Sequence, residues 1–283
     1  MGHFTSHSAV PRGICAFLLA AAALLCACIG PQPLPDPDAI TFAVIGGTAP
    51  ESPFGPMSPW IDEAVRSMNA DSPVFILHTG DIVYGGESAV GIKESDIARQ
   101  FNEFKVRSSG ALPNIYTVRG DLDTLDGSPE MYQRMTGRGR YYSFNYGNLH
   151  FIVLDTTDPI PGVVGGAQMR WLEDDLAAYA DSPALFVFTH HPVLLPQAAY
   201  YGDPPLVLKN ASDLIALFAR HRVKAVFSGH MKSSFTEKKD GILYVTAGCG
   251  NFNERLPFAQ ENQYYLVRFS SQEIAVTGKK LKP

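Results

Sequence analysis

Four short polar segments of this chain carry residue types that bind metal ions, and each follows an apolar run. The segments are Thr79-Gly80-Asp81, Arg119-Gly120-Asp121-Leu122-Asp123, His190-His191-Pro192 and Gly229-His230-Met231-Lys232. Carboxylate oxygens and imidazole nitrogens together suit a borderline divalent transition metal. Each segment alone is common, because Gly-Asp is an ordinary turn and a lone histidine is usually structural. Four such segments in order predict a metal site.

These segments need a scaffold that brings several strand ends together. Apolar, β-branched runs predict strands at 40–46, 74–79, 114–118, 184–189, 223–228, 242–246, 264–269 and 273–277, and a hairpin of 141–146 with 149–154 around Gly147-Asn148. Amphipathic runs predict helices from Ser58-Pro59 to Met68 and at 95–108, 168–179 and 212–220. Because loops beyond the carboxyl ends of strands converge in open α/β sheets, we expect the polar segments to meet.

The order of these elements indicates one α/β domain over residues 40–283. Strands and helices alternate, and strand pairs come late in the chain, which favours a sandwich of two packed mixed sheets over a fully parallel, doubly wound sheet. Of 283 residues, 46% are apolar and 18% are charged, enough for a sizeable core. The net charge of −5 argues against a nucleic-acid partner. Cys249 is the one cysteine beyond the first thirty residues, so a disulfide-stapled scaffold is excluded.

The N-terminal segment is predicted to be an export signal. The apolar run from Ile14 to Ile29 follows Arg12 and is shorter than the roughly 18–20 residues that span a bilayer. Its end, Leu25-Cys26-Ala27-Cys28, resembles the lipobox of bacterial lipoproteins. That resemblance implies a signal peptide over residues 1–27, lipidation of Cys28, a Pro-rich tether over 28–39, and anchoring to the bacterial envelope, at the periplasm or the cell surface. The alternative is ordinary secretion with cleavage nearby.

The four polar segments and the residues around them resemble the calcineurin-like metallophosphoesterases, within them the purple-acid-phosphatase-like branch. The resemblance extends from about Thr41 to Thr277 and includes Gly80–Tyr84 (GDIVY), Tyr141–Asn148 (YYSFNYGN), His150–Asp155 (HFIVLD), and Gln168 with Trp171-Leu172. It implies a four-layer α/β/β/α sandwich of two mixed β-sheets flanked by helices. Family members hold two metal ions about 3.5 Å apart that share one aspartate and activate a water against a phosphate ester.

Carried over residue by residue, the resemblance implies one intact metal site and one lost site. The intact site has the bridging aspartate, an aspartate in place of the family's asparagine, and two histidines: Asp81, Asp121, His190 and His230. The lost site lacks the Asp-x-His of the first motif, where Gly47-Thr48-Ala49 stands, and the last histidine, where Lys232 stands. We therefore expect one divalent or trivalent transition metal, iron, manganese or zinc, and no second one.

Of the remaining positions in the family's motifs, some match the family residue and others do not. Leu122 stands where the family has the histidine that assists the leaving group, so no residue is assigned a catalytic role. Tyr84 matches the tyrosine that binds iron in purple acid phosphatases, and is a candidate for a metal ligand or a wall of the site. His191 and Lys232 are candidates for phosphate contacts; both can alternatively face solvent, and Lys232 can also pair with Asp81. His78 and His150 lie within strand patterns and are expected to support the packing.

Two functions follow from this pattern. The first is a phosphoric-ester hydrolase, anchored by lipid, with one metal site lost and with reduced or specialised activity. The alternative is a catalytically inactive member of the family that acts as an envelope-anchored binding or scaffold protein. Both readings name a phosphate ester or a phosphate-containing ligand, and a membrane contact through the N-terminal lipid.

Overall fold

The computed structural model describes residues 39–195, 208–248, 262–270 and 273–281, which all lie in the unit from Asp38 to Pro283. The predicted signal segment, the lipidation candidate Cys28 and Cys249 lie outside these residues. No helix among the described residues combines the length and apolar character needed to cross a membrane.

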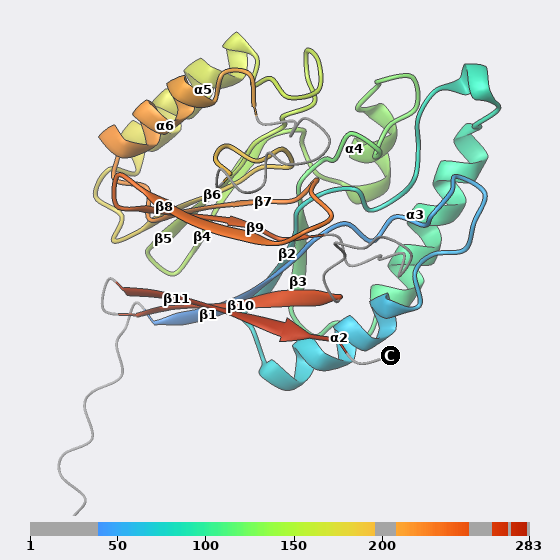
Figure 1. The fold of residues 1–283 in the computed structure, drawn as a ribbon, viewed down its shortest axis with the longest axis horizontal. Helices are drawn as coiled ribbons and strands as arrows, with labels where there is room; N and C mark the ends of the chain where they lie inside the picture. The colour runs from blue at the N-terminus through green and yellow to red at the C-terminus, as the bar shows by residue number, and fades with distance from the viewer. Residues whose placement is uncertain (1–38, 196–207, 249–261, 271–272, 282–283) are drawn as a thin grey trace, which may run out of the picture. The chain divides into compact units, whose positions relative to one another are not determined.

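Two mixed β-sheets form the centre of the fold (Figure 1). The first has the order β11-β10-β1-β2-β3, with β1 (Ile40–Ile45), β2 (Phe75–His78), β3 (Asn114–Thr117), β10 (Gln263–Ser270) and β11 (Glu273–Lys280). The second has the order β4-β5-β6-β7-β9-β8, with β4 (Tyr142–Tyr146), β5 (Leu149–Val153), β6 (Leu185–Phe188), β7 (Ala225–Ser228), β8 (Phe235–Lys239) and β9 (Ile242–Thr246). Strands β1, β2 and β3 run parallel in the first sheet, and strands β5, β6, β7 and β9 run parallel in the second.

Helices cover the outer faces of both sheets, which completes the four predicted layers. Within the described residues the helices are α2 (Trp60–Asp71), α3 (Glu94–Ser108), α4 (Glu130–Thr136), α5 (Gly166–Ala178) and α6 (Ala211–Arg220), and a 3-10 turn, η1, spans Ser88–Val90. Figure 1 shows α5 and α6 on the second sheet, where their apolar faces share one buried cluster with β5, β6 and β7. The α2 helix packs in the same way on β1, β2 and β10. The predicted fold class is confirmed.

Aromatic side chains fill the space between the two sheets. Phe42 of β1 stacks on Phe75 of β2, with ring centroids 5.0 Å apart, and meets Phe151 of β5 edge-on at 5.7 Å. Phe151 in turn stacks on Phe186 of β6 at 5.2 Å. Aromatic pairs in these arrangements add to the gain from burial. The polar loops at the strand ends therefore rest on a rigid, close-packed interior.

The structure also contains elements that the sequence pattern did not predict. The short α4 helix and the β8 edge strand have no counterpart among the predicted elements, whereas the predicted hairpin is present as β4 and β5 with Gly147 at φ 59°. In α4 only Met131 and Tyr132 are buried. A helix with two buried side chains gives no helical repeat of apolar residues, and the mostly polar β8 shows no clear alternation.

Candidate metal centre

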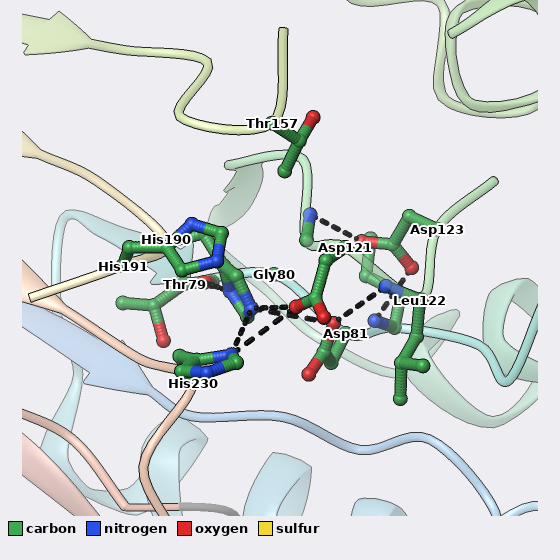
Figure 2. Close-up of polar contacts among 12 residues, drawn as sticks. Thr79, Gly80, Asp81, Asp121, Leu122, Asp123, Thr157, His190, His191 and His230 are labelled. Atoms are coloured by element: carbon green, nitrogen blue, oxygen red, sulfur yellow. Dashed lines mark hydrogen bonds and ion pairs between the residues drawn. The ribbon is translucent and has the colours of Figure 1, made fainter. Parts of the chain in front are cut away.

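Four side chains from four strand ends meet in one cluster (Figure 2). Asp81 follows β2 and Asp121 follows β3 in the first sheet, whereas His190 follows β6 and His230 follows β7 in the second. Each residue offers one ligand atom, and these atoms all lie within 4.8 Å of one another. The structure thus brings together all four residues of the metal site expected from the sequence.

His190 is fixed in the orientation that metal binding requires. Its Nδ1 donates to the backbone carbonyl of Thr79 at 2.8 Å, because a carbonyl only accepts. Its Nε2 consequently faces the carboxylates, 2.7 Å from Oδ1 of Asp121 and 3.4 Å from Oδ1 of Asp81. Metal-binding histidines are commonly held in this way, through a second ring nitrogen bonded to a carbonyl. The donor set, two carboxylates and two imidazoles, fits manganese, iron or zinc.

The backbone of the turns is unusual at two of the four residues. Asp81 has φ 55° and His230 has φ 62°, in the left-handed region that non-glycine residues rarely adopt. Gly80 precedes Asp81 at φ 97°, and a Cβ there would lie 2.6 Å from Nδ1 of His190. Such strained positions cluster at functional sites. The turn after β2 is therefore shaped to place Asp81 against His190, and substitution of Gly80 would disturb both.

Asp123 fastens two of these turns together, which gives this residue a structural role. Its side chain is completely buried, and its Oδ1 accepts from the backbone amides of Ile82 and Val83 at 2.8 and 3.0 Å. Its Oδ2 accepts from the amide of Gly120 at 2.9 Å. Burial and the nearby Asp81 raise the pKa of Asp123 to about 7, although the hydrogen bonds from the amides of Gly120 and Val83 lower it. Asp123 thus links the loop that carries Asp81 to the loop that carries Asp121.

The cluster concentrates opposite charges. Burial opposes the protonated form of His190, but Asp81 and Asp121 outweigh it and raise the pKa of His190 to about 10. Burial also opposes the ionised form of Asp121, but hydrogen bonds from His190 and His230 hold its pKa below the usual range. For Asp81, burial is the dominant influence and raises the pKa. Without a metal ion, a protonated His190 therefore neutralises part of the carboxylate charge.

Metal binding is expected to release about one proton at pH 8. The raised pKa of about 10 keeps His190 protonated there, and a histidine must lose this proton before its nitrogen can bind a metal. Protons therefore compete with the metal, and the affinity should rise about tenfold per pH unit between pH 7 and 9. Calorimetric titrations in buffers of different ionisation enthalpy measure the released protons. Binding without proton release at pH 8 would contradict a protonated His190.

Candidate residues around the cluster occupy different environments. His191 is completely buried, so its predicted solvent-facing alternative is wrong; burial, with His190 and His230 nearby, lowers its pKa to about 2, and the ring is neutral. Lys232 is exposed and makes no ion pair with Asp81, whose ion-pair partner among the described residues is His190. Leu122 is half-buried and donates its backbone amide to Asp81 at 3.1 Å. Tyr84 is half-buried, and its role as a ligand stays a prediction.

The segment that replaces the first family motif satisfies its own hydrogen bonds. The amides of Thr48 and Ala49 both donate to the backbone carbonyl of Asp81 at 2.9 Å. The Thr48 hydroxyl lies 3.0 Å from Nε2 of His78, whose Nδ1 accepts from the Gly80 amide at 3.2 Å. Burial and His190 lower the pKa of His78 to about 3, so this ring is neutral and supports the turn, as predicted. Residues 47–49 are Gly, Thr and Ala, so this segment has no carboxylate or imidazole to offer the cluster.

A buried ion pair joins the two sheets beside the cluster. Arg119 and Asp155 are 2% and 1% exposed in their side chains, and Nη1 of Arg119 lies 3.2 Å from Oδ2 of Asp155. Gln168 of α5 holds the backbone of Asp155 from both sides, accepting from its amide at 2.8 Å and donating to its carbonyl at 2.7 Å. No local sequence pattern indicates this pair, since its members lie 36 residues apart. It connects the end of β3 to the end of β5.

His150 supports a different part of the fold. Its Nδ1 and Nε2 lie 2.6 Å from Oδ1 of Asn145 and 2.8 Å from Oδ2 of Asp175, and its ring stacks on Tyr179 at 3.6 Å. Both ring nitrogens are therefore bonded outside the cluster. The predicted packing role of His150 is confirmed.

Comparisons with known proteins agree with this architecture. Residues 56–233 match the model of the calcineurin-like phosphoesterase family. A dimetal phosphatase from Danio rerio is 13% identical with a TM-score of 0.67, and the match covers 86% of this chain and 96% of that chain. A purple acid phosphatase from yellow lupin seeds is 15% identical with a TM-score of 0.62, over 86% and 52% of the two chains. GAP50, the anchor in the inner membrane complex of Plasmodium, is 13% identical with a TM-score of 0.55, over 86% and 85%.

The sequence comparison with curated proteins found no match. The structural likenesses, all at low identity, concern the fold, whereas the family model covers most of the domain, including all segments that build the cluster. Two packed mixed sheets, polar turns at the carboxyl ends of their strands and the family match lead to one conclusion. The chain belongs to the calcineurin-like phosphoesterase family.

Proposed function

We propose that this protein is a one-metal phosphoesterase with reduced or specialised activity on phosphate esters. The observation that carries the proposal is the convergence of ligand atoms from Asp81, Asp121, His190 and His230 within 4.8 Å, next to a first motif without ligand side chains. A bound divalent cation supplies Lewis-acid stabilisation of charge on a phosphoryl oxygen. The membership of the family supports phosphate esters as the class of substrate.

The protein's own residues supply positioning. The Thr79 carbonyl orients His190, and Asp123 holds the turns of the two aspartates together. The side chains of Asp121 and His230 are 26% and 17% exposed, whereas that of His190 is 0% exposed. A ligand would therefore enter on the side of Asp121 and His230. Leu122 offers no proton to a leaving group, which favours substrates whose leaving group departs without protonation.

The purified protein is expected to hold about one transition-metal equivalent and to cleave activated esters slowly. General acid help is worth about 10²–10⁴-fold, so its absence at Leu122 need not abolish cleavage of a nitrophenyl ester. Elemental analysis measures the metal, and assays with p-nitrophenyl phosphate, bis-p-nitrophenyl phosphate and an alkyl phosphate measure the reaction. Two tightly held equivalents, or equal rates on nitrophenyl and alkyl esters, would contradict the proposal.

A second candidate is a catalytically inactive binding or scaffold protein. It is favoured by Leu122, an apolar side chain at the position of the family's acid histidine, and by the absence of ligand side chains at Gly47 and Ala49. GAP50 of Plasmodium, an anchor, has the same fold. Phosphate binding with one metal and no cleavage of either nitrophenyl ester would favour this candidate over the hydrolase.

We also propose export and lipid anchoring of the chain. The support is the apolar run that ends in Leu25-Cys26-Ala27-Cys28, followed by a Pro-rich segment that would serve as a tether to the domain. Several acyl chains at one cysteine would anchor the protein stably.

Replacement of the proposed lipidation site should release the protein from membranes or block its processing. Cys28→Ser is expected to move the protein to the soluble fraction or to leave the signal segment uncleaved, because the acylated thiol is then missing. Cys26→Ser is the matched control and should stay membrane-bound. Fractionation and mass spectrometry of the mature N-terminus test this. An unmodified Cys28 within an intact N-terminus would refute the lipoprotein reading.

A further inference from the structure

His191 has a ring nitrogen that no group in the described part of the chain satisfies. The side chain is 0% exposed, and its Nε2 has no hydrogen-bond partner there. Buried polar atoms of native proteins are almost always hydrogen-bonded, so this nitrogen calls for a partner from outside those residues. The ring lies beside the cluster, with centroids 4.6 Å from His230 and 5.1 Å from His190 (Figure 2). The unsatisfied atom therefore belongs to a ring that packs against the two histidines of the cluster.

The hydroxyl of Thr156 decides which ring nitrogen of His191 carries the proton. Its Oγ1 accepts from the backbone amide of His191 at 3.1 Å and lies 2.8 Å from Nδ1 of the same residue. If the hydroxyl donates to Nδ1, the proton of the neutral ring sits on Nε2. If Nδ1 donated instead, the hydroxyl proton and the Nε2 lone pair would both lack a partner among the described groups. The first arrangement leaves one unsatisfied group rather than two, so Nε2 is an N–H donor.

We propose that the Nε2–H of His191 donates a hydrogen bond to a phosphoryl oxygen of the ligand held at the cluster. This subsite rests on the proposed function, since it takes the same phosphate-containing ligand. A phosphoryl oxygen satisfies a donor that the described protein groups leave unpaired. The hydroxyl of Thr157, the residue next to Thr156, is not available for this, because it donates to Asp155 at 2.6 Å.

The Nε2–H donor of His191 is more important here because this chain lacks histidines that other members of the family have. Ala49, Leu122 and the exposed Lys232 stand at positions where the family has histidines, so these positions place no imidazole against a bound phosphate. His191 is rigidly oriented, because Thr156 bonds both its backbone amide and its Nδ1. A preorganised, buried N–H donor pays little to order itself when a charged acceptor arrives. His191 thus binds the phosphoryl group and does not enter the metal's ligand set.

The test compares three variants of the full chain, each loaded with zinc. His191→Phe keeps the bulk and removes the donor, His191→Gln retains an N–H donor, and His150→Phe removes a buried imidazole whose partners lie outside the cluster. Calorimetry measures zinc affinity first and then the affinity for inorganic phosphate. Long-range ¹H–¹⁵N spectra of the wild type report which nitrogen of His191 carries the proton, with and without phosphate.

His191→Phe is expected to lower phosphate affinity about 10- to 100-fold, the range for a hydrogen bond to a charged group, with zinc affinity unchanged. His191→Gln should recover most of this loss, and His150→Phe should bind phosphate like the wild type. The spectra should place the proton on Nε2 and shift its signal with phosphate.

Several results would overturn the subsite. The first is a His191→Phe variant that binds phosphate as tightly as the wild type, or that loses zinc affinity together with phosphate affinity. The second is a wild-type spectrum that places the proton of His191 on Nδ1. The third is a zinc-loaded wild type that binds no phosphate, in which case a water satisfies Nε2. A wild type that binds no zinc refutes the proposed function instead. The subsite is then decided on the metal-free protein, where a phosphate-dependent shift of the Nε2–H signal supports it and an unchanged signal overturns it.

Discussion

His190→Ala is expected to weaken metal binding more than about 100-fold. Loss of an outer partner of a metal ligand already costs about 10- to 100-fold, and His190 is a central donor of the cluster rather than an outer partner. Its Nε2 lies 2.7 Å from Asp121 and 3.4 Å from Asp81, in an orientation fixed by Thr79. The variant also leaves two carboxylates facing each other without a cation, which raises the cost of ionising both.

Elemental analysis after dialysis and calorimetric titration with manganese or zinc measure this effect. His190→Gln serves as a second variant with similar volume, because an alanine at a fully buried position also lowers the free energy of unfolding. His150→Gln is the matched control, a buried histidine whose nitrogens contact Asn145 and Asp175 instead. Unchanged metal affinity in His190→Gln and His190→Ala would remove the cluster as the metal site.

Restoring the family residues should rebuild the second metal site and then the reaction. The triple variant Gly47→Asp, Ala49→His, Lys232→His supplies the missing ligands and should raise the metal content from about one to about two equivalents. Addition of Leu122→His should increase the hydrolysis rate a further 10²–10⁴-fold, the usual contribution of general acid catalysis. Asp123 can orient the added histidine, because its Oδ2 accepts from Gly120 alone among the described groups and keeps acceptor capacity.

Two measurements test these predictions: the metal content of each variant and the rate at which it hydrolyses an alkyl phosphate. The comparison that isolates the acid is the triple variant against the quadruple variant, since both hold the same metals. If the triple variant still binds one equivalent, residues 47, 49 and 232 do not form the lost site. If both variants bind two equivalents and cleave at the same rate, the position of Leu122 has no acid role.

Strand ends explain why much of the site could be predicted from the sequence. Asp81, Asp121, His190 and His230 each follow an apolar run, and parallel strands present such residues at one edge. The sequence pattern and the family resemblance therefore selected the residues that the structure brings together. The four layers could be predicted as well, since the central strands are continuous apolar runs buried on both faces and each predicted helix has one apolar face.

Contacts between distant segments explain what could not be predicted. Asp123 accepts from amides about 40 residues earlier in the chain, and nothing in its local sequence announces those donors. The orientation of His191 depends on a hydrogen bond to Thr156, 35 residues away, which lies close to it only because β5 and β6 are neighbours. Lys232 shows the converse: it lies two residues after His230 in the sequence, but its side chain makes no ion pair with Asp81. Any residue except proline can supply a backbone amide, so the residue types in a single sequence do not reveal which distant amides a side chain will bind.

The Arg119–Asp155 ion pair makes local opening of the site a cooperative event. If the turn after β3 were to open alone, Asp155 would stay behind as a buried charge without its partner, and such a charge is strongly disfavoured. The same holds for Arg119 when the end of β5 opens. At these ends the backbone amide of Val118 donates to the carbonyl of His78, and that of Leu154 donates to the carbonyl of Phe188. We therefore expect the amides at the two strand ends to lose their protection from hydrogen exchange together. The metal-site loops thus belong to one unit of local unfolding rather than to two independently mobile edges.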